Sequence, residues 1–332
     1  MRIGILGAGT WGMALGRMLG NDGYEVTVWS HNEEHARELD QTRRHRNLPG
    51  MIIPDSIRFT SDIAEACADQ KIILCAVPSV HVRSTMEKAK DHIQDGQIIV
   101  DVAKGIETDT LYTMTQVIED VLKGKDVKTV ALSGPTHAEE VAKDMPTTIV
   151  SASKDEEAAK TVQEVFMNTC MRVYTNEDVL GVELCGALKN IIALASGISS
   201  GLGYGDNARA AIITRGMVEM TRLGLAMGAH KDTFPGLAGI GDLIVTATSA
   251  HSRNNRCGNL IGQGMSAEEA VKEVGMVVEG LNALPAAMRL QEKYQVELPI
   301  ISMVDAIVKG KIDPKSAVAQ LMGRDKKNEN NI

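Results

Sequence analysis

A lysine lies in the middle of an otherwise apolar stretch of the chain. Lys189 falls within residues 181–195, Gly-Val-Glu-Leu-Cys-Gly-Ala-Leu-Lys-Asn-Ile-Ile-Ala-Leu-Ala, and apolar residues cover nearly every face of the helix that this stretch predicts. Burial disfavours the charged form of a lysine and a nearby carboxylate restores it, so a buried lysine costs stability unless it is paired or used. Lys189 is therefore predicted to be a general acid and base, and a structural ion pair is the alternative.

An aspartate further along the chain is suited to be the partner of Lys189. Asp242 follows the glycine-rich residues 236–241, which are predicted to form a flexible loop, and it precedes an apolar segment. A carboxylate in such surroundings is unfavourable without a cation. We therefore expect Asp242 to pair with Lys189.

A polar cluster at residues 251–256, His-Ser-Arg-Asn-Asn-Arg, precedes another predicted helix. Ser252 can cap that helix. Arg253 and Asn254 supply the forked and amide donors that suit a phosphate. A solvated basic loop is the competing interpretation.

The first twelve residues carry a cofactor signal. The pattern Gly-x-Gly-x-x-Gly, between a predicted strand and a predicted helix, is formed by Gly7, Gly9 and Gly12. In this context the first glycine makes a tight turn, the second lets the backbone approach a pyrophosphate, and the third lets helix and strand pack closely. The pyrophosphate then binds backbone N–H groups at the helix N-terminus. This predicts dinucleotide binding, with Thr10 and Trp11 in the turn and touching the cofactor; an ordinary glycine turn is the alternative.

The residues after the second predicted strand bear on which dinucleotide binds. An NAD-specific site usually carries an acid here for the ribose 2′-hydroxyl, but residues 29–32 are Trp-Ser-His-Asn and the first carboxylate is Glu33. Because no acid repels a 2′-phosphate there, we predict that NADP is accepted together with NAD and that His31 contacts the adenosine end. His31 and His35 are four residues apart, but the position after His31 is Asn32 rather than the glutamate of a zinc-binding His-Glu-x-x-His helix, so no metal site is predicted.

Two further segments follow predicted strands. Ligands bind at the carboxyl ends of the strands in such sheets. Lys104 lies just past a strand predicted at residues 97–103, and residues 133–138, Ser-Gly-Pro-Thr-His-Ala, end another strand and open a helix. The residues expected to face a ligand, the last three as donors to an anion, are Lys104, Gly134, Thr136 and Ala138. A surface lysine and a plain strand-to-helix connection are the alternatives.

The elements that must position these residues form two groups. Strands that alternate with helical stretches are predicted at residues 2–6, 24–29, 57–60, 71–78, 97–103, 129–133, 147–152 and 172–175. This alternation predicts an α/β fold with an N-terminal Rossmann-type, doubly wound, mostly parallel sheet. From residue 177 the apolar spacing is helical, which predicts an all-α C-terminal domain. We expect a dinucleotide-binding domain at 1–177, an all-helical substrate and catalytic domain at 178–323, and a polar, disordered tail at 324–332.

Composition limits the class of protein. Of 332 residues, 44% are hydrophobic and 23% are charged, and the formal net charge is −8, which argues against a nucleic-acid or anionic-membrane surface. The basic run at residues 43–54 is interpreted as a solvated loop. Five cysteines without a Cys-x-x-Cys pattern predict neither a zinc site nor a disulfide framework. No signal peptide is predicted, which favours the cytoplasm, and the apolar residues 179–198 are interpreted as a helix buried in protein.

Taken in order, these segments resemble the bacterial NAD(P)-dependent glycerol-3-phosphate dehydrogenase family over almost the whole chain. The matching segments are residues 7–12, 102–105, 132–136, 183–190, 203–207, 236–248 and 251–254. Three residues depart from the family's pattern: Asn47, Cys185 and Leu281. The resemblance implies a cytoplasmic enzyme that supplies phospholipid synthesis, commonly as a homodimer.

The resemblance also implies roles for individual residues. Lys189 would be the proton donor and acceptor, and Lys104 would touch both substrate and nicotinamide. The other residues implied to line the substrate are Gly134, Thr136, Asp242, Ser252, Arg253 and Asn254. The residues implied to hold the cofactor are Thr10, Trp11, His31, Lys104, Ala138, Arg253, Val277 and Glu279.

The predicted activity is reversible reduction of dihydroxyacetone phosphate to sn-glycerol 3-phosphate with NADP or NAD. In it Lys189 protonates the carbonyl oxygen, Asp242 orients Lys189, and Lys104 polarises the carbonyl. The expected partner is a small triose phosphate, with no nucleic acid and no membrane insertion. Two alternatives stay open: a related two-domain β-hydroxyacid dehydrogenase, and a non-catalytic regulator that binds a dinucleotide.

Overall fold

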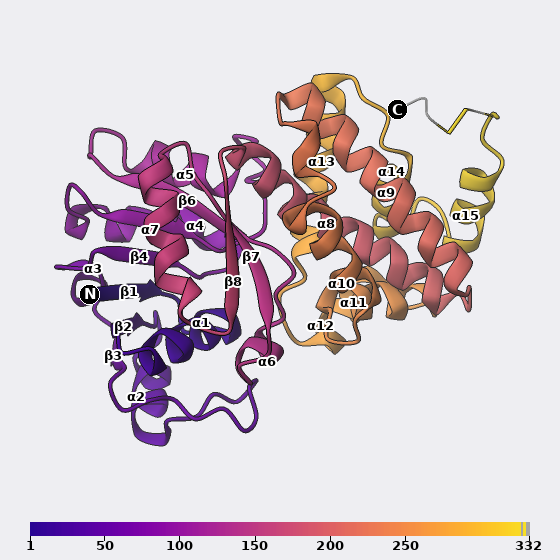
Figure 1. Ribbon diagram of the computed structural model, residues 1–332. Helices are drawn as coiled ribbons and strands as arrows, with labels where there is room; N and C mark the ends of the chain where they lie inside the picture. Colours follow the sequence, from indigo (N-terminus) through magenta and orange to yellow (C-terminus); the bar gives the residue numbers. More distant parts are fainter. Residues whose placement is uncertain (327, 330–332) are drawn as a thin grey trace. The chain divides into compact units, whose positions relative to one another are not determined.

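The computed structural model describes residues 1–326 and 328–329 of the chain, which forms two compact units (Figure 1). Unit 1 consists of Met1–Lys104 and Met114–Val179, and unit 2 of Gly105–Thr113 and the chain from Leu180 onward. The segment Gly105–Thr113 was expected in the first domain; its packing assigns it to unit 2 instead. Part of the tail predicted at 324–332, namely residues 327 and 330–332, lies outside the described residues.

Unit 1 is built on one eight-stranded sheet with the order β3-β2-β1-β4-β5-β6-β7-β8. The strands are β1 (Arg2–Leu6), β2 (Glu25–Trp29), β3 (Arg58–Thr60), β4 (Ile72–Cys75), β5 (Ile98–Asp101), β6 (Lys128–Ser133), β7 (Thr147–Ala152) and β8 (Met171–Asn176). Only β6 and β7 pair antiparallel; the other neighbours are parallel. The prediction of a mostly parallel sheet is confirmed.

Both faces of the central strands of this sheet are buried. Successive side chains of a strand point to opposite faces, and in β4 Ile72 and Leu74 belong to one apolar cluster whereas Ile73 and Cys75 belong to another. Helices α1 (Thr10–Asn21) and α7 (Glu156–Met167) contribute to the first cluster, and α3 (Ile63–Cys67), α4 (Val82–Ala89) and α5 (Met114–Val121) to the second. Two α-helices and two 3-10 helices complete unit 1: α2 (Glu33–Thr42), α6 (Ala138–Val141), η1 (Ser79–His81) and η2 (Lys90–His92).

Unit 2 is helical, as predicted. Its α-helices are α8 (Val179–Gly201), α9 (Asp206–Met227), α10 (Asp242–Thr248), α11 (Arg253–Gly262), α12 (Ala267–Val274), α13 (Glu279–Tyr294), α14 (Pro299–Val308) and α15 (Pro314–Met322). A 3-10 helix, η3 (Lys231–Thr233), and a π-helix, η4 (Leu237–Gly241), lie between α9 and α10.

Helix α8 is the core of unit 2. Within the described residues it is the one helix long and apolar enough to cross a membrane, and 94% of its most apolar window is buried in protein. Glycines bring α11 directly onto it: a Cβ added at Gly197 of α8 would lie 2.1 Å from the Asn255 oxygen, and one at Gly258 of α11 would lie 2.1 Å from the Leu194 oxygen. This close approach places the polar start of α11 beside the middle of α8.

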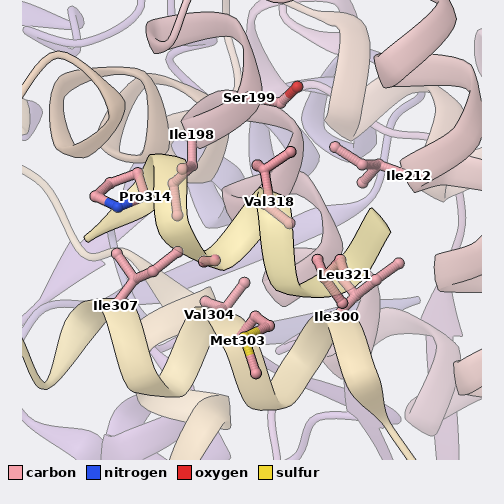
Figure 2. A pocket seen from close by; sticks show the side chains of 12 residues that line it. Ile198, Ser199, Ile212, Ile300, Met303, Val304, Ile307, Pro314, Val318 and Leu321 are labelled. Atoms are coloured by element: carbon pink, nitrogen blue, oxygen red, sulfur yellow. The ribbon is translucent and has the colours of Figure 1, made fainter. Parts of the chain in front are cut away.

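A small apolar cavity lies elsewhere in unit 2. It has a volume of about 50 Å³ and is lined by side chains of α8, α9, α14 and α15 (Figure 2). Among the lining residues are Ile198, Val304 and Val318, and no charged side chain faces it. The cavity therefore has no group that could take part in acid–base chemistry.

Candidate active site

The three glycines of the turn between β1 and α1 differ in whether the surrounding protein requires glycine. Gly7 has φ +124°, and an added Cβ there would lie 2.5 Å from the Ala76 oxygen; at Gly12 it would lie 2.2 Å from the Gly7 oxygen. At Gly9 an added Cβ meets no heavy atom within 4 Å. Two of the glycines are therefore required by packing, and Gly9 leaves open space.

The helix that follows this turn can bind an anion. Gly9 is the N-cap of α1, and no side chain caps its first N–H groups, which are the groups that bind a pyrophosphate in such turns. The open position at Gly9 together with these uncapped N–H groups fits a dinucleotide. Thr10 and Trp11 were predicted in the turn, but they form the first helical residues of α1 and are half-buried.

The segment after β2 begins the helix α2. His31 is exposed, with its ring 6.5 Å from that of Trp29, and Asn32 caps α2 by accepting a hydrogen bond from the His35 backbone. Residues 43–54 form a loop, as predicted, and Arg44 and Arg46 are exposed. The loop is only partly solvated, because Leu48, Met51 and Ile53 are buried in the same apolar cluster as β1 and α1. Within the described residues no group of three or more His, Cys, Asp or Glu could hold a metal ion.

The ends of β5 and β6 are joined by a lysine. Lys104 Nζ donates a hydrogen bond to the Gly134 carbonyl at 2.9 Å, and Thr136 Oγ1 donates to the same oxygen at 3.1 Å. Both hydrogen bonds use the Gly134 carbonyl; that the Gly134 backbone donates to an anion stays a prediction. Ala138 is half-buried and begins the four-residue helix α6. The two segments, predicted separately to follow strands, thus meet at the carboxyl ends of the paired strands β5 and β6.

The centre of unit 2 holds a buried ion pair. Lys189 Nζ lies 2.8 Å from Asp242 Oδ1, and the two side chains are 5% and 1% exposed, so the predicted pairing is present. Thr246, one turn after Asp242 in α10, accepts a hydrogen bond from Lys189 Nζ at 2.5 Å and donates one to the Asp242 carbonyl at 2.7 Å. The ammonium is thus held by two oxygens of one helix turn.

The glycine-rich segment before Asp242 is helical. It was predicted as a flexible loop, but residues 237–241 form the π-helix η4, which runs directly into α10. A Cβ added at Gly239 would lie 1.9 Å from the Phe234 oxygen, so only glycine permits this turn. Single π-helical turns occur frequently at functional sites, and this one sets where Asp242 enters its helix.

The start of α11 is tied to α8 by an asparagine pair. Asn254 Nδ2 donates to Asn190 Oδ1 at 2.9 Å, and Asn254 Oδ1 accepts from the Gly280 backbone at 2.8 Å. Ser252 caps α11 as predicted, since its hydroxyl accepts from the Asn255 backbone at 3.2 Å. Arg253 is exposed beside this network. Asn254, predicted as a phosphate donor, has its carbonyl oxygen engaged in joining α8, α11 and the start of α13.

Val277 and Glu279 lie where α13 begins. Val277 is 36% exposed, and Glu279 is the first residue of the helix and accepts a hydrogen bond from Asn282 Nδ2 at 3.1 Å. Because the network of Asn254 reaches Gly280, this end of α13 is connected to the start of α11. Within unit 2 the structure therefore groups Lys189, Asp242 and Thr246. Asn254 links Asn190, the residue after Lys189, to Gly280, the residue after Glu279.

Glu183 and Glu219 of unit 2 are buried carboxylates that were not predicted from the sequence. Glu183 accepts a hydrogen bond from Thr113 Oγ1 at 2.7 Å. Glu219 accepts hydrogen bonds from the backbone of Ile300 at 2.7 Å and of Ile301 at 3.1 Å, at the N-terminus of α14. Burial raises the pKa of Glu219 to about 7, and the two backbone hydrogen bonds and Arg222 lower it in part. Both carboxylates serve unit 2 as structural acceptors.

Comparison with known proteins gives the family. One family model, the NAD-dependent glycerol-3-phosphate dehydrogenase N-terminus, matches residues 2–159, and its counterpart for the C-terminus matches residues 178–319. The chain belongs to the NAD-dependent glycerol-3-phosphate dehydrogenase family. The resemblance found in the sequence motifs is confirmed.

Relatives of this dehydrogenase family cover the whole chain. It is 67% identical to glycerol-3-phosphate dehydrogenase (NAD(P)+) 2 of Lactobacillus delbrueckii subsp. bulgaricus over 99% of this chain and 98% of the relative. A Fusobacterium nucleatum glycerol-3-phosphate dehydrogenase (NAD(P)+) is 49% identical over 99% and 98% of the two chains. The crystal structure of the Coxiella burnetii glycerol-3-phosphate dehydrogenase is similar, with TM-score 0.93 at 36% identity over 97% of this chain and 99% of that one.

Sequence reasoning missed Thr246 in this family member. Thr246 can be inferred only once Asp242 is known to begin a helix, because residues four apart lie on the same helix face. Glu183 gave no signal of its own, since its partner Thr113 lies 70 residues earlier in the chain. Contacts of this kind depend on the fold rather than on local spacing.

Proposed function

We propose that this chain catalyses the reversible reduction of dihydroxyacetone phosphate to sn-glycerol 3-phosphate with NADPH or NADH. The observation that carries the proposal is the buried cluster of Lys189, Asp242 and Thr246. A lysine at this depth costs stability, and a positioned proton donor is what reduction of a carbonyl needs besides a hydride. The bound nicotinamide supplies that hydride.

Each residue of the cluster has a role in moving one proton. The ammonium of Lys189 donates a proton from Nζ to the carbonyl oxygen during reduction and takes it back during oxidation. Asp242 keeps the lysine charged and Thr246 restricts where Nζ can lie, because both oxygens come from the same turn of α10. The fixed position of Nζ lowers the cost of bringing donor and acceptor together.

Other residues are assigned to binding. Arg253 and Asn254, at the N-terminus of α11, are assigned to the substrate phosphate, together with Ser252, Gly134 and Thr136, and Lys104 is assigned to polarising the carbonyl. The glycine turn with Thr10 and Trp11 is assigned to the pyrophosphate, His31 to the adenosine end, and Ala138, Val277 and Glu279 to the rest of the cofactor. The exposure of Arg253 leaves its guanidinium available for a phosphate.

The metabolic setting follows from the reaction. A product glycerol phosphate is the precursor of glycerol-based phospholipids, so we assign the protein to their supply. A cytoplasmic homodimer is our expectation for it. Size-exclusion chromatography with light scattering would measure the assembly.

The test is a substrate comparison. Purified protein is given NADPH, and separately NADH, with dihydroxyacetone phosphate or with unphosphorylated dihydroxyacetone as the matched control. We expect rapid oxidation of both cofactors with the phosphate ester alone. Turnover on a β-hydroxyacid or its ketone in place of the triose phosphate would favour the related dehydrogenase, and tight cofactor binding with no turnover would favour the regulator.

A further inference from the structure

Helix α10 carries two groups of the buried cluster but is only 7 residues long, Asp242–Thr248. Isolated helices shorter than about 12 residues are marginal in water, so contacts with neighbouring elements must decide where α10 lies. At its start α10 continues from the π-helix η4, and Lys189 of α8 binds Asp242 and Thr246. Different contacts hold its C-terminal end.

One carbonyl at the C-terminal end of α10 accepts hydrogen bonds from side chains of two other helices. The hydroxyl of Ser196 in α8 donates to the Ala247 carbonyl at 3.0 Å, and Asn255 Nδ2 in α11 donates to the same oxygen at 2.8 Å. The last carbonyls of a helix have no partner within it, and a carbonyl oxygen can accept two hydrogen bonds. The Ala247 carbonyl is thus held from α8 and from α11 at once.

The two donors meet because α8 and α11 pack with their backbones in contact. A Cβ added at Gly197 would lie 2.1 Å from the Asn255 backbone oxygen, so Asn255 lies beside Ser196, the residue before Gly197. The Asn255 backbone N–H donates to the Ser252 hydroxyl at 3.2 Å, which leaves the Asn255 side chain to reach α10. Because Ser196 and Ala247 are fully buried, water does not readily replace a donor lost there.

Both ends of α10 are therefore tied to the helix that carries Lys189. Ser196 follows Lys189 by about two turns of α8, so the two side chains lie on the same face of that helix. Lys189 binds Asp242 and Thr246, and Ser196 binds the residue after Thr246. Movement of the C-terminal end of α10 would change the distances from Lys189 Nζ to both of its partners.

We propose that Ser196 and Asn255 are positioning residues for proton transfer, which hold the carboxylate and the hydroxyl of α10 against the ammonium of Lys189. They act through the Ala247 carbonyl, a backbone atom of α10, rather than by contact with the proton that moves. This inference rests on the proposed reduction of dihydroxyacetone phosphate and extends it to two residues outside the buried cluster.

Three variants remove the donors and leave every side chain of the cluster in place. Ser196→Ala and Asn255→Ala each leave one hydrogen bond on the carbonyl, and the double variant removes both. Ser200→Ala is the matched control in α8, because the Ser200 hydroxyl donates to a carbonyl of its own helix at 3.1 Å. Asn259→Ala is the matched control in α11, because Asn259 accepts from Gln263 at the end of the same helix at 2.8 Å.

The experiment measures kcat for reduction of dihydroxyacetone phosphate and, by calorimetric titration, the dissociation constant of NADH, on variants shown to be folded by circular dichroism. We expect each single variant to lower kcat about threefold to tenfold and the double variant about 10²-fold, the effect of displacing a catalytic group by about 1 Å. The solvent isotope effect on kcat should increase in the double variant, because a displaced donor slows proton transfer. The dissociation constant of NADH, and kcat of both controls, should stay near the wild-type values.

The outcomes separate positioning from a purely structural role. Wild-type kcat in the double variant, or an equal loss of kcat in the controls, would overturn the proposal. A lower thermal stability with kcat and the isotope effect unchanged would overturn it too. If the double variant did not fold, wild-type kcat in both single variants would reject the role. A wild-type chain without turnover would reject the proposed function and this inference together, whereas wild-type turnover with unresponsive variants would reject this inference alone.

Discussion

Residues 7–12 of unit 1 and residues 236–241 of unit 2 are both glycine-rich turns that lead into a helix, and they use glycine for different ends. In the first, Gly9 keeps space that no protein atom occupies. In the second, an added Cβ at Gly239 would collide with the Phe234 carbonyl. The turn at residues 7–12 leaves open space at Gly9, where a ligand can bind. The turn at residues 236–241 is packed against protein, which fixes the position of Asp242.

The contrast shows that glycine count does not reveal function. Both segments carry three glycines, and they differ in the structure that leads into the following helix. A strand before residue 7 leaves the first N–H groups of α1 uncapped, whereas the π-helix before Asp242 continues the helical hydrogen bonding into α10. An anion can bind the first helix end but is excluded from the second.

The largest effect is expected for Lys189, the partner of Asp242. Replacing Lys189 by Met removes the proton donor, so kcat should fall by about 10²- to 10⁴-fold, while the dissociation constant of NADH stays unchanged. Steady-state kinetics and cofactor titration measure the two quantities. Because the substitution leaves Asp242 buried without the lysine charge beside it, the double variant Lys189→Met, Asp242→Asn is the control: it should regain thermal stability but not turnover. Wild-type turnover in either variant would remove Lys189 from the mechanism.

A substitution within the second turn tests whether it only positions Asp242. Gly239→Ala forces the π-helix to shift, since its Cβ would lie 1.9 Å from the Phe234 oxygen. We expect kcat to fall by about 10²-fold, the effect of a displacement of about 1 Å in a catalytic group. The cofactor dissociation constant should not change. A variant that lost cofactor affinity and kept kcat would reverse the roles assigned to the two turns.

Two alanine substitutions in the first turn test the space reserved there. Gly9→Ala meets no protein atom, so its free energy of unfolding should stay within about 0.5 kcal/mol of the wild type, while the dissociation constant of NADH rises about tenfold or more. Gly12→Ala meets the Gly7 oxygen and should cost about 1–3 kcal/mol of stability. Urea unfolding and cofactor titration distinguish the two. If both variants lost stability alike, Gly9 would be structural.

The smallest effect on catalysis is expected for buried charge in unit 2 away from Lys189. The pKa of Glu219 is raised to about 7 by burial, so between its ordinary pKa near 4.5 and pH 7 the folded state binds more protons than the unfolded state. Stability should therefore decrease as pH rises through this window, by up to about 3 kcal/mol from this group. In Glu219→Gln that component should disappear, whereas kcat should not change. Unfolding measured at pH 5, 6, 7 and 8 gives the slope; equal slopes in both proteins would contradict the assignment.

The features that sequence reasoning predicted are those set by local pattern. Runs of apolar residues gave every strand of the sheet, and a charge inside an apolar helix gave Lys189 and its need for a carboxylate. The features it missed depend on contacts between distant segments. The π-helix of residues 237–241 arises from packing against Phe234, and the role of Glu219 depends on the start of α14.

The segment Gly105–Thr113 interrupts unit 1 in sequence and completes unit 2 in space. As the chain leaves the ribosome, this segment appears before every helix of its own unit, because its partners come later: Glu183 binds Thr113, and Arg289 binds the Thr108 carbonyl. Domains generally fold as units during synthesis, the N-terminal one first. Unit 1 can thus fold before the partners of this segment have been synthesised, and the segment packs against unit 2 afterwards. No single cut of the chain would yield unit 2 whole.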